Sequence, residues 1–276
     1  MKETMPKLFL AMDKIAAANR LIFLCFGWMI LVQPFSCHSA PEGLAKKESG
    51  FPSKGANKSN FETQASVAIP ANHASTPITI IDRPILFNGK RIDLTKEYIL
   101  NHYGISSKSI EIVPKMVVIH WTAVPSLEGS FNTFNGVQLP FYRKDIRKAS
   151  ELNVSIHFLV DRNGLIYRLM PETWMARHII GLNYCSIGIE NVGDGTKWPL
   201  TDAQLRADEN LIRYLVEKYP SIEYLIGHHE YGKFKESHLW LEKDPNYFTI
   251  KSDPGDVYMK QLRINLSDLD LKAKPE

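Results

Sequence analysis

Apolar residues along the second half of the chain gather into short runs, each followed by polar residues, glycine or proline. The main runs occupy residues 116–120, 155–160, 165–169, 186–190 and 224–226. Runs of this length are typical of strands buried on both faces of a sheet. The Asp-Arg-Asn-Gly sequence at 161–164 predicts that the second and third runs pair as a hairpin. Two further runs, 78–81 and 110–113, predict an opening strand and loop that pack on the domain.

Between these runs the apolar spacing becomes helical. Thr201 and Gln204 form a capping box, and Pro220 ends the pattern that follows it. The apolar positions of that helix are Leu205, Leu211, Ile212, Leu215, Val216 and Tyr219. A short helix is expected within 142–148 and a closing helix over 256–266. Strands interleaved with helices predict an α/β fold, with a mixed central β-sheet flanked by helices in a single catalytic domain over 78–270.

The first 77 residues follow a different pattern. Basic residues precede an uninterrupted apolar run at 21–32, which is short for a bilayer span. We therefore interpret residues 1–37 as a signal peptide or an N-terminal anchor. Ser36-Cys37 resembles the end of a lipobox, so lipidation at Cys37 competes with ordinary cleavage. Residues 38–77 are polar and small, which predicts a flexible linker. The chain is expected to be exported to the periplasm or the extracellular space, and a membrane tether through the N-terminus stays open.

Composition and charge argue against several classes of function and structure. The 276 residues carry a formal net charge of +3 and no concentrated basic stripe, so a nucleic-acid partner is not expected. The chain has three cysteines with no regular spacing, which argues against a disulfide framework and against a structural zinc knuckle. A weakly basic protein is compatible with an acidic polymer as its partner.

Two histidines and one aspartate stand out as possible metal ligands. His120 and His228 each end an apolar run, and Asp253 lies in a Lys-Ser-Asp-Pro-Gly loop. Neighbouring strand ends in a sheet lie about 5 Å apart, so these side chains can meet. Catalytic zinc sites use three protein ligands and leave the fourth position to water. The alternative interpretation is two ordinary core histidines and a turn aspartate.

Two charged residues lie where they can serve such a site. Glu190 ends the run at 186–190, as either a solvated strand end or a general base. Lys251 precedes Asp253 by two positions, so in an extended segment both side chains point the same way. That geometry would direct an ammonium group at an oxyanion, although lysine is usually a surface residue.

The order of these motifs resembles a known family. The carrying segments are VVIHWTA (117–123), SIHFLVDRNGLIYRLMPE (155–172), ARHI (176–179), CSIGIENVGDG (185–195), the TDAQ helix, LIGHHE (225–230) and KSDPG (251–255). Together they resemble the zinc-dependent N-acetylmuramoyl-L-alanine amidases of the type-2 amidase family, which are related to peptidoglycan recognition proteins. The resemblance covers about residues 112–265.

The resemblance implies one Zn²⁺ and a peptidoglycan or muropeptide substrate, cleaved between N-acetylmuramic acid and L-alanine. His120, His228 and Asp253 match the zinc ligands. Glu190 matches the catalytic acid/base, and Lys251 matches the residue that stabilises the tetrahedral intermediate. In addition, His178 matches a substrate-binding pocket histidine, whereas His157 falls on a family strand and is expected to be a packing residue.

The chain departs from the family in three places. His229 follows His228 directly, so the ligand assignment could shift by one residue. The segment 230–250 is an insertion relative to close relatives and is expected to shape a groove or to cover the metal. It contains Lys243-Asp244-Pro245, a second possible ligand motif without the final glycine. In addition, residues 126–150 do not align, which leaves substrate contacts there unassigned.

Two other functions fit the same residues. A non-catalytic peptidoglycan-binding module would resemble those recognition proteins that lack a complete metal set. A zinc peptidase would cut the stem peptide between amino acids instead. The sequence does not decide between intact wall and small muropeptides, nor does it give the oligomeric state.

Overall fold

The computed structural model describes residues 78–276. The strands are β1 (Ile80–Asp82), β2 (Met116–Trp121), β3 (Phe158–Val160), β4 (Ile166–Arg168), β5 (Ser186–Asn191) and β6 (Tyr224–Gly227). The α-helices are α1 (Gly89–Tyr98), α2 (Leu127–Asn135), α3 (Lys144–Arg147), α4 (Asp202–Lys218) and α5 (Asp256–Asn265). The π-helical turn η1 (Ile99–Tyr103) and the 3₁₀ helices η2 (Asn183–Cys185), η3 (His228–Phe234) and η4 (Ser267–Leu269) complete this part of the chain.

The six strands form one mixed sheet in the order β1-β4-β3-β5-β2-β6. Strands β3, β5, β2 and β6 run parallel to one another, whereas β4 pairs antiparallel with β3 and parallel with β1. This arrangement confirms the α/β prediction. The expected hairpin is confirmed as β3 and β4, which pair around the turn at 161–164.

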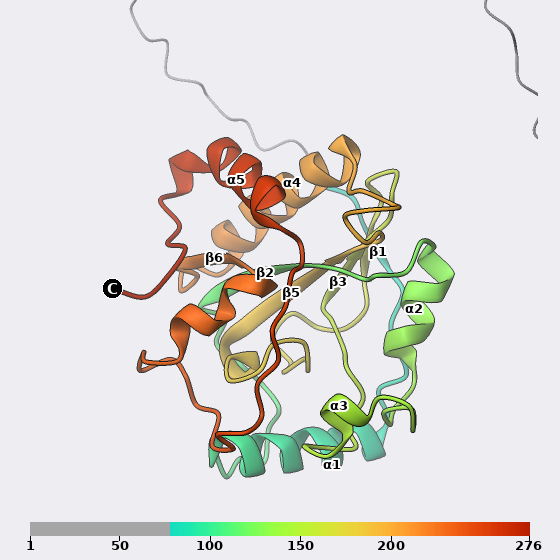
Figure 1. Ribbon diagram of the computed structural model, residues 1–276, viewed down its shortest axis with the longest axis vertical. Coiled ribbons are helices and arrows are strands. Elements are labelled where there is room, and N and C mark those ends of the chain that lie inside the picture. The colour runs from blue at the N-terminus through green and yellow to red at the C-terminus, as the bar shows by residue number, and fades with distance from the viewer. Residues whose placement is uncertain (1–77) are drawn as a thin grey trace, which may run out of the picture. The chain divides into compact units, whose positions relative to one another are not determined.

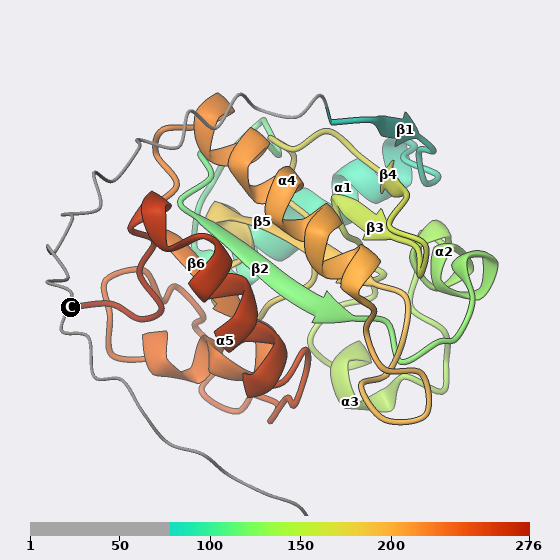
Figure 2. The same cartoon turned by 90° about the horizontal axis from the view of Figure 1, so that it is seen from above.

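Helices cover both faces of the sheet (Figure 1). Helices α4 and α5 lie on one face, and α1 lies on the other, as the perpendicular view also shows (Figure 2). Alternation along β2 explains the two apolar cores, because successive side chains point to opposite faces. Val117 and Ile119 pack with α4 and α5, whereas Met116 and Val118 pack with α1 and the 230–250 segment.

The parallel strands bring three chain segments to one edge of the sheet. In the register of β2 and β5, His120 lies opposite Glu190, and Ile119 lies opposite Gly227 of β6. The carboxyl ends of β5, β2 and β6 therefore meet at the same edge, which is the usual place for a ligand site in a parallel sheet. Residue His228 follows directly at the start of η3.

The first part of the domain contains the expected opening strand, β1 at Ile80–Asp82. Residues 110–113 form the expected loop, in which Glu111 pairs with Trp174 through an isolated bridge. Residues 89–103, for which we made no prediction, form α1 and η1. Helix α1 buries Arg91 and Thr95 together with Leu94, so its hydrophobic pattern is weak and its position depends on tertiary contacts.

The expected signal peptide or anchor and the linker lie outside the described residues and stay predictions. Within residues 78–276, no helix has the length and apolar character needed to cross a bilayer.

The buried carboxylate Glu172 is expected to contribute to the pH dependence of the free energy of unfolding. Lys218 and Arg168 bond to it at 3.0 and 3.1 Å. Burial alone would raise the pKa of Glu172, but these hydrogen bonds outweigh it and hold the pKa below its ordinary value. A lowered folded-state pKa contributes stability above the unfolded pKa, about 4.3, and this stability is lost as pH falls through the folded value.

The variant Glu172→Gln should therefore lower the unfolding free energy at pH 7 by about 2 kcal/mol and flatten its acid limb. Urea denaturation at several pH values measures both effects. As a control, Glu128→Gln alters an exposed carboxylate paired with Arg83 and should have little effect. An unchanged acid limb in Glu172→Gln would contradict the assignment.

Candidate active site

A cavity of about 270 Å³ opens at the carboxyl edge of the parallel strands. It is lined by residues from distant parts of the chain, among them every site residue expected from the sequence: His120, His178, Glu190, His228, Lys251 and Asp253. The strands deliver His120 and Glu190, η3 delivers His228, and the loop before α5 delivers Lys251 and Asp253. The fold therefore concentrates the expected chemistry in one place.

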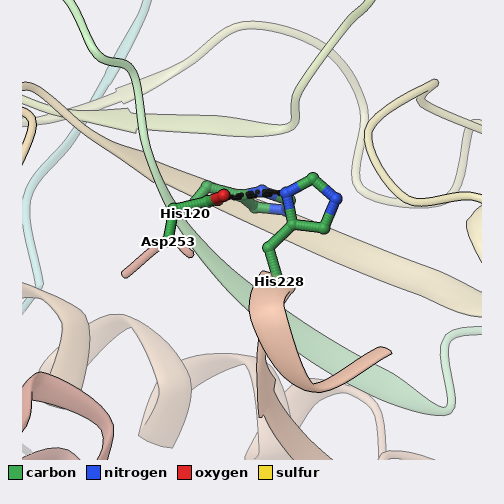
Figure 3. Close-up of side chains that lie close together, drawn as sticks. All are labelled: His120, His228 and Asp253. Atoms are coloured by element: carbon green, nitrogen blue, oxygen red, sulfur yellow. Dashed lines mark hydrogen bonds and ion pairs between the residues drawn. The ribbon is translucent and has the colours of Figure 1, made fainter. Parts of the chain in front are cut away.

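Three of these side chains converge on a common point (Figure 3). Nδ1 of His120 lies 3.0 Å from Nδ1 of His228 and 3.2 Å from Oδ2 of Asp253. The third separation, from His228 Nδ1 to Asp253 Oδ2, is 3.0 Å. Tetrahedral ligands with bonds of about 2.0 to 2.1 Å to zinc lie about 3.3 Å apart, so the three atoms fit three corners of such a site.

The protonation of this group also suits a cation. Burial, followed by the nearby His120 ring, lowers the pKa of His228 to about 4, so its imidazole is neutral at pH 7. Burial opposes ionisation of Asp253, but the two histidines outweigh it and hold the pKa of Asp253 well below its ordinary range. A neutral imidazole and an ionised carboxylate are the forms that bind divalent metals. The donor set therefore fits a metal ion.

Glu190 is the unusual carboxyl of the cavity. Its side chain is buried, and its Oε2 has no hydrogen-bond partner among residues 78–276. Burial and the charge of Asp253 raise the pKa of Glu190 well above its ordinary value, although Lys251 partly opposes the shift. A carboxyl group with a raised pKa beside a metal site is suited to accept and return a proton near neutral pH.

His178 packs against the metal-binding group. Its Nδ1 lies 3.0 Å from Nε2 of His120, on the side of that ring opposite Nδ1. Burial lowers the pKa of His178 well below its ordinary value, so the ring is neutral. If His120 binds a metal through Nδ1, its Nε2 carries the hydrogen and donates it to His178. Such outer partners fix the orientation of a ligand ring.

The two adjacent histidines differ in where their rings lie. His228 contributes to the converging group, whereas the His229 ring contacts the Asp253 carbonyl through Nδ1 at 3.0 Å and Asp256 through Nε2 at 2.9 Å. His229 therefore lies behind the loop that carries Asp253. The alternative aspartate, Asp244, belongs to an exposed turn in which its side chain accepts from the Asn246 amide.

The 230–250 segment forms part of the cavity wall. Tyr247 and Thr249 line the cavity, and Thr249 Oγ1 is buried with no hydrogen-bond partner in the described part of the chain. The expectation that this segment shapes a groove therefore agrees with the geometry. His157 lies in the core, where its ring contacts the Trp174 carbonyl and the Gly188 amide, consistent with packing.

Two arginines of the cavity were missed by the sequence reasoning. Arg177 is buried and donates to the Ile146 carbonyl at 2.8 Å and to the Tyr247 hydroxyl at 2.9 Å. Arg143, from the region 126–150 for which no substrate contact was predicted, lines the cavity and is half-exposed. Arg177 lies in the ARHI segment, where only His178 was given a role, and Arg143 lies in a region left unassigned; arginine is usually exposed, so neither was expected in a cavity.

The fold and the site define an α/β protein with a buried His-His-Asp metal-binding group at the carboxyl ends of parallel strands. Residues 110–256, just over half of the chain, match the family model described as N-acetylmuramoyl-L-alanine amidase. The chain belongs to this family. The matched range includes all six expected site residues.

Comparison with curated proteins found no match. Among solved structures, an endolysin amidase from Clostridium intestinale is 19% identical, covering 72% of this chain and 99% of that one, with a TM-score of 0.43. The amidase AmiD from E. coli is 22% identical over 62% of each chain, with a TM-score of 0.40. Bumblebee PGRP-SA is 20% identical, covering 71% and 99%, with a TM-score of 0.42. We draw nothing about the substrate from these similarities.

Proposed function

We propose that this protein is a zinc-dependent N-acetylmuramoyl-L-alanine amidase. Its substrate would be peptidoglycan or a muropeptide, and the bond cut would be the amide between N-acetylmuramic acid and L-alanine. The observation that carries the proposal is the complete buried set of His120, His228 and Asp253, with the perturbed carboxyl Glu190 in the same cavity. Family membership supports the reaction type.

His120, His228 and Asp253 would hold one Zn²⁺. When bound, zinc supplies Lewis-acid polarisation of the scissile carbonyl and makes water more acidic. Glu190 would take the proton from the attacking water and pass it to the leaving nitrogen of L-alanine, because its raised pKa makes it a stronger base than an ordinary carboxylate. The ammonium group of Lys251 would stabilise the negative charge that develops on the carbonyl oxygen.

His178 has a position that suits two roles. The sequence resemblance implies that it contacts substrate, and it does line the cavity. Its Nδ1, however, faces His120 at 3.0 Å. We propose that His178 orients the His120 ring, while its exposed edge borders the bound muropeptide.

We also propose that the enzyme acts outside the cytoplasm. This proposal comes from the basic and apolar pattern of residues 1–37 and the polar stretch at 38–77 alone. The same segment would serve as a tether if cleavage does not occur or if Cys37 is lipidated.

Digestion of peptidoglycan by the purified full-length protein tests the proposed function. We expect products that carry a free L-alanine amine and a free lactyl carboxyl group, identified by mass. A chelator should stop the reaction and added zinc should restore it, because zinc is the Lewis acid that polarises the scissile carbonyl in the proposed reaction. Cleavage between amino acids would indicate a stem-peptide peptidase. A protein that binds wall material without zinc and without cleavage would be a recognition module.

A further inference from the structure

A second carboxyl group is buried on the face of the sheet opposite the cavity. Asp208 of α4 is fully buried and forms no ion pair within residues 78–276. Its Oδ2 accepts hydrogen bonds from Asn191 Nδ2 at 2.9 Å and from the Tyr258 hydroxyl at 2.8 Å. Burial raises the pKa of Asp208 to about 7. Burying a carboxyl group without a cationic partner costs folding free energy, which suggests that Asp208 has a structural or functional role.

The first partner of Asp208 is attached to the strand that carries Glu190. Asn191 follows Glu190 in β5, and alternation along the strand directs Glu190 into the cavity and Asn191 to the helical face. The Asn191 Nδ2 also lies 3.4 Å from the backbone oxygen of His120. Asp208 therefore holds a side chain that touches the ends of both β5 and β2.

The second partner is attached to the loop that carries Asp253. Tyr258 lies in the first turn of α5, which begins at Asp256, three residues after Asp253. Near this end of α5, the other side-chain contact to an earlier element joins His229 to Asp256, whose carboxylate is 95% exposed. The buried bond from Tyr258 to Asp208 is therefore the better shielded of the two.

Helices α4 and α5 are also joined near the C-terminal end of α5, by a partly exposed arginine. Arg213 of α4 donates to the Asn265 carbonyl at 2.9 Å and to Asp268 at 2.6 Å. This contact lies at the far end of α5 from Asp253 and involves no residue of the cavity. It supplies a matched control, because it ties α4 to α5 without reaching the site.

We propose that Asp208 is a positioning residue for the metal site. Through Tyr258 it fixes the start of α5 and so the loop that presents Asp253. Through Asn191 it fixes the end of β5 and so the side chain of Glu190. The inference rests on the proposed function for the roles of Asp253 and Glu190, and it adds a residue outside the cavity on which both depend.

Zinc affinity and steady-state kinetics of the full-length protein test this proposal. Tyr258→Phe removes one hydroxyl and is expected to weaken zinc binding about tenfold, measured by competition with a chelating dye. This is the lower end of the range for lost partners of ligand side chains, because Tyr258 acts on Asp253 through the backbone of the loop. With zinc at saturation its kcat should stay near that of the wild type. Asp208→Leu should weaken zinc binding by at least as much and, in addition, lower kcat at saturating zinc while KM changes little.

The double variant Tyr258→Phe/Asp208→Leu should bind zinc no more weakly than Asp208→Leu alone, because both changes break the same contact. The control Arg213→Met should lower Tm and leave zinc affinity unchanged. Variants of Tyr258 and Asp208 that lower Tm as the control does, with wild-type zinc affinity and kcat, would overturn the proposal. Zinc binding by a wild type that cleaves no muropeptide would contradict the proposed function, while the zinc measurements would still decide the role of Asp208.

Discussion

Replacing Glu190 with glutamine is expected to abolish amide hydrolysis while zinc stays bound. Glutamine has nearly the same size and shape as glutamate, so the cavity should keep its form. It cannot accept the proton of the attacking water, whereas Glu190 is buried with a free Oε2 and a pKa raised well above its ordinary value. We expect kcat on muropeptide to fall by about 10²- to 10⁴-fold, the range typical of a general acid/base.

The measurement pairs initial rates of muropeptide cleavage with the zinc content of the same samples. Glu172→Gln serves as the control, because Glu172 is also buried but bonds to Lys218 and Arg168 away from the cavity. It should keep wild-type kcat at a temperature where it remains folded. Substantial residual activity in Glu190→Gln would remove Glu190 from the role of acid/base.

The second large effect is expected at Asp253. The variant Asp253→Ala should lose zinc and, with it, activity. The carboxylate is the one anionic member of the converging group, and it is held ionised by the two histidines. Removal of a partner outside the ligand shell typically costs 10- to 100-fold in metal affinity, so we expect a loss of more than about 100-fold for a direct ligand.

The insertion provides a matched control for this change. Asp244 also stands before a proline, but it lies in an exposed turn. We therefore expect Asp244→Ala to keep both its zinc and its activity. Zinc affinity from chelator competition distinguishes the two variants. Retention of zinc by Asp253→Ala, or its loss in Asp244→Ala, would show that the aspartate ligand has been assigned wrongly.

Local sequence was sufficient for much of the fold. The alternation of apolar runs and the Asn-Gly turn predicted the β3–β4 hairpin, and the capping box predicted the start of α4, where the Thr201 side chain accepts from the Gln204 amide. These features depend on contacts between residues close in sequence, so their signals are complete within a short window. Helix α1 has a local start signal in its N-cap Asn88, whose side chain accepts from the Arg91 amide, but it was not predicted because it buries polar side chains such as Arg91 and so lacks a clear apolar spacing.

The residues of the candidate site also fall into those that the sequence predicted and those that it did not. The positions of His120, Glu190, His228 and Asp253, at strand ends and in glycine-containing turns, identified them as candidate site residues from sequence. The order of the motifs indicated the family. Arg177 lies in the ARHI motif but its place in the cavity was not predicted, since its partners Ile146 and Tyr247 lie far away along the chain. Lys251 was marked by its spacing from Asp253 and by the KSDPG motif, and it lines the same cavity as His120, His228 and Asp253.

The sequence by itself determined the fold class, the family and the residues with metal-binding chemistry, because periodicity, turn residues and motif order are local or ordered along the chain. Only the tertiary structure placed His228, rather than His229 or Asp244, beside His120 and Asp253, raised the pKa of Glu190 and connected Asp208 to Asn191 and Tyr258. Each of these depends on burial and on separations of about 3 Å between segments distant in sequence. Such separations are fixed by the packing of α4, α5 and the strands, which no short stretch of sequence contains.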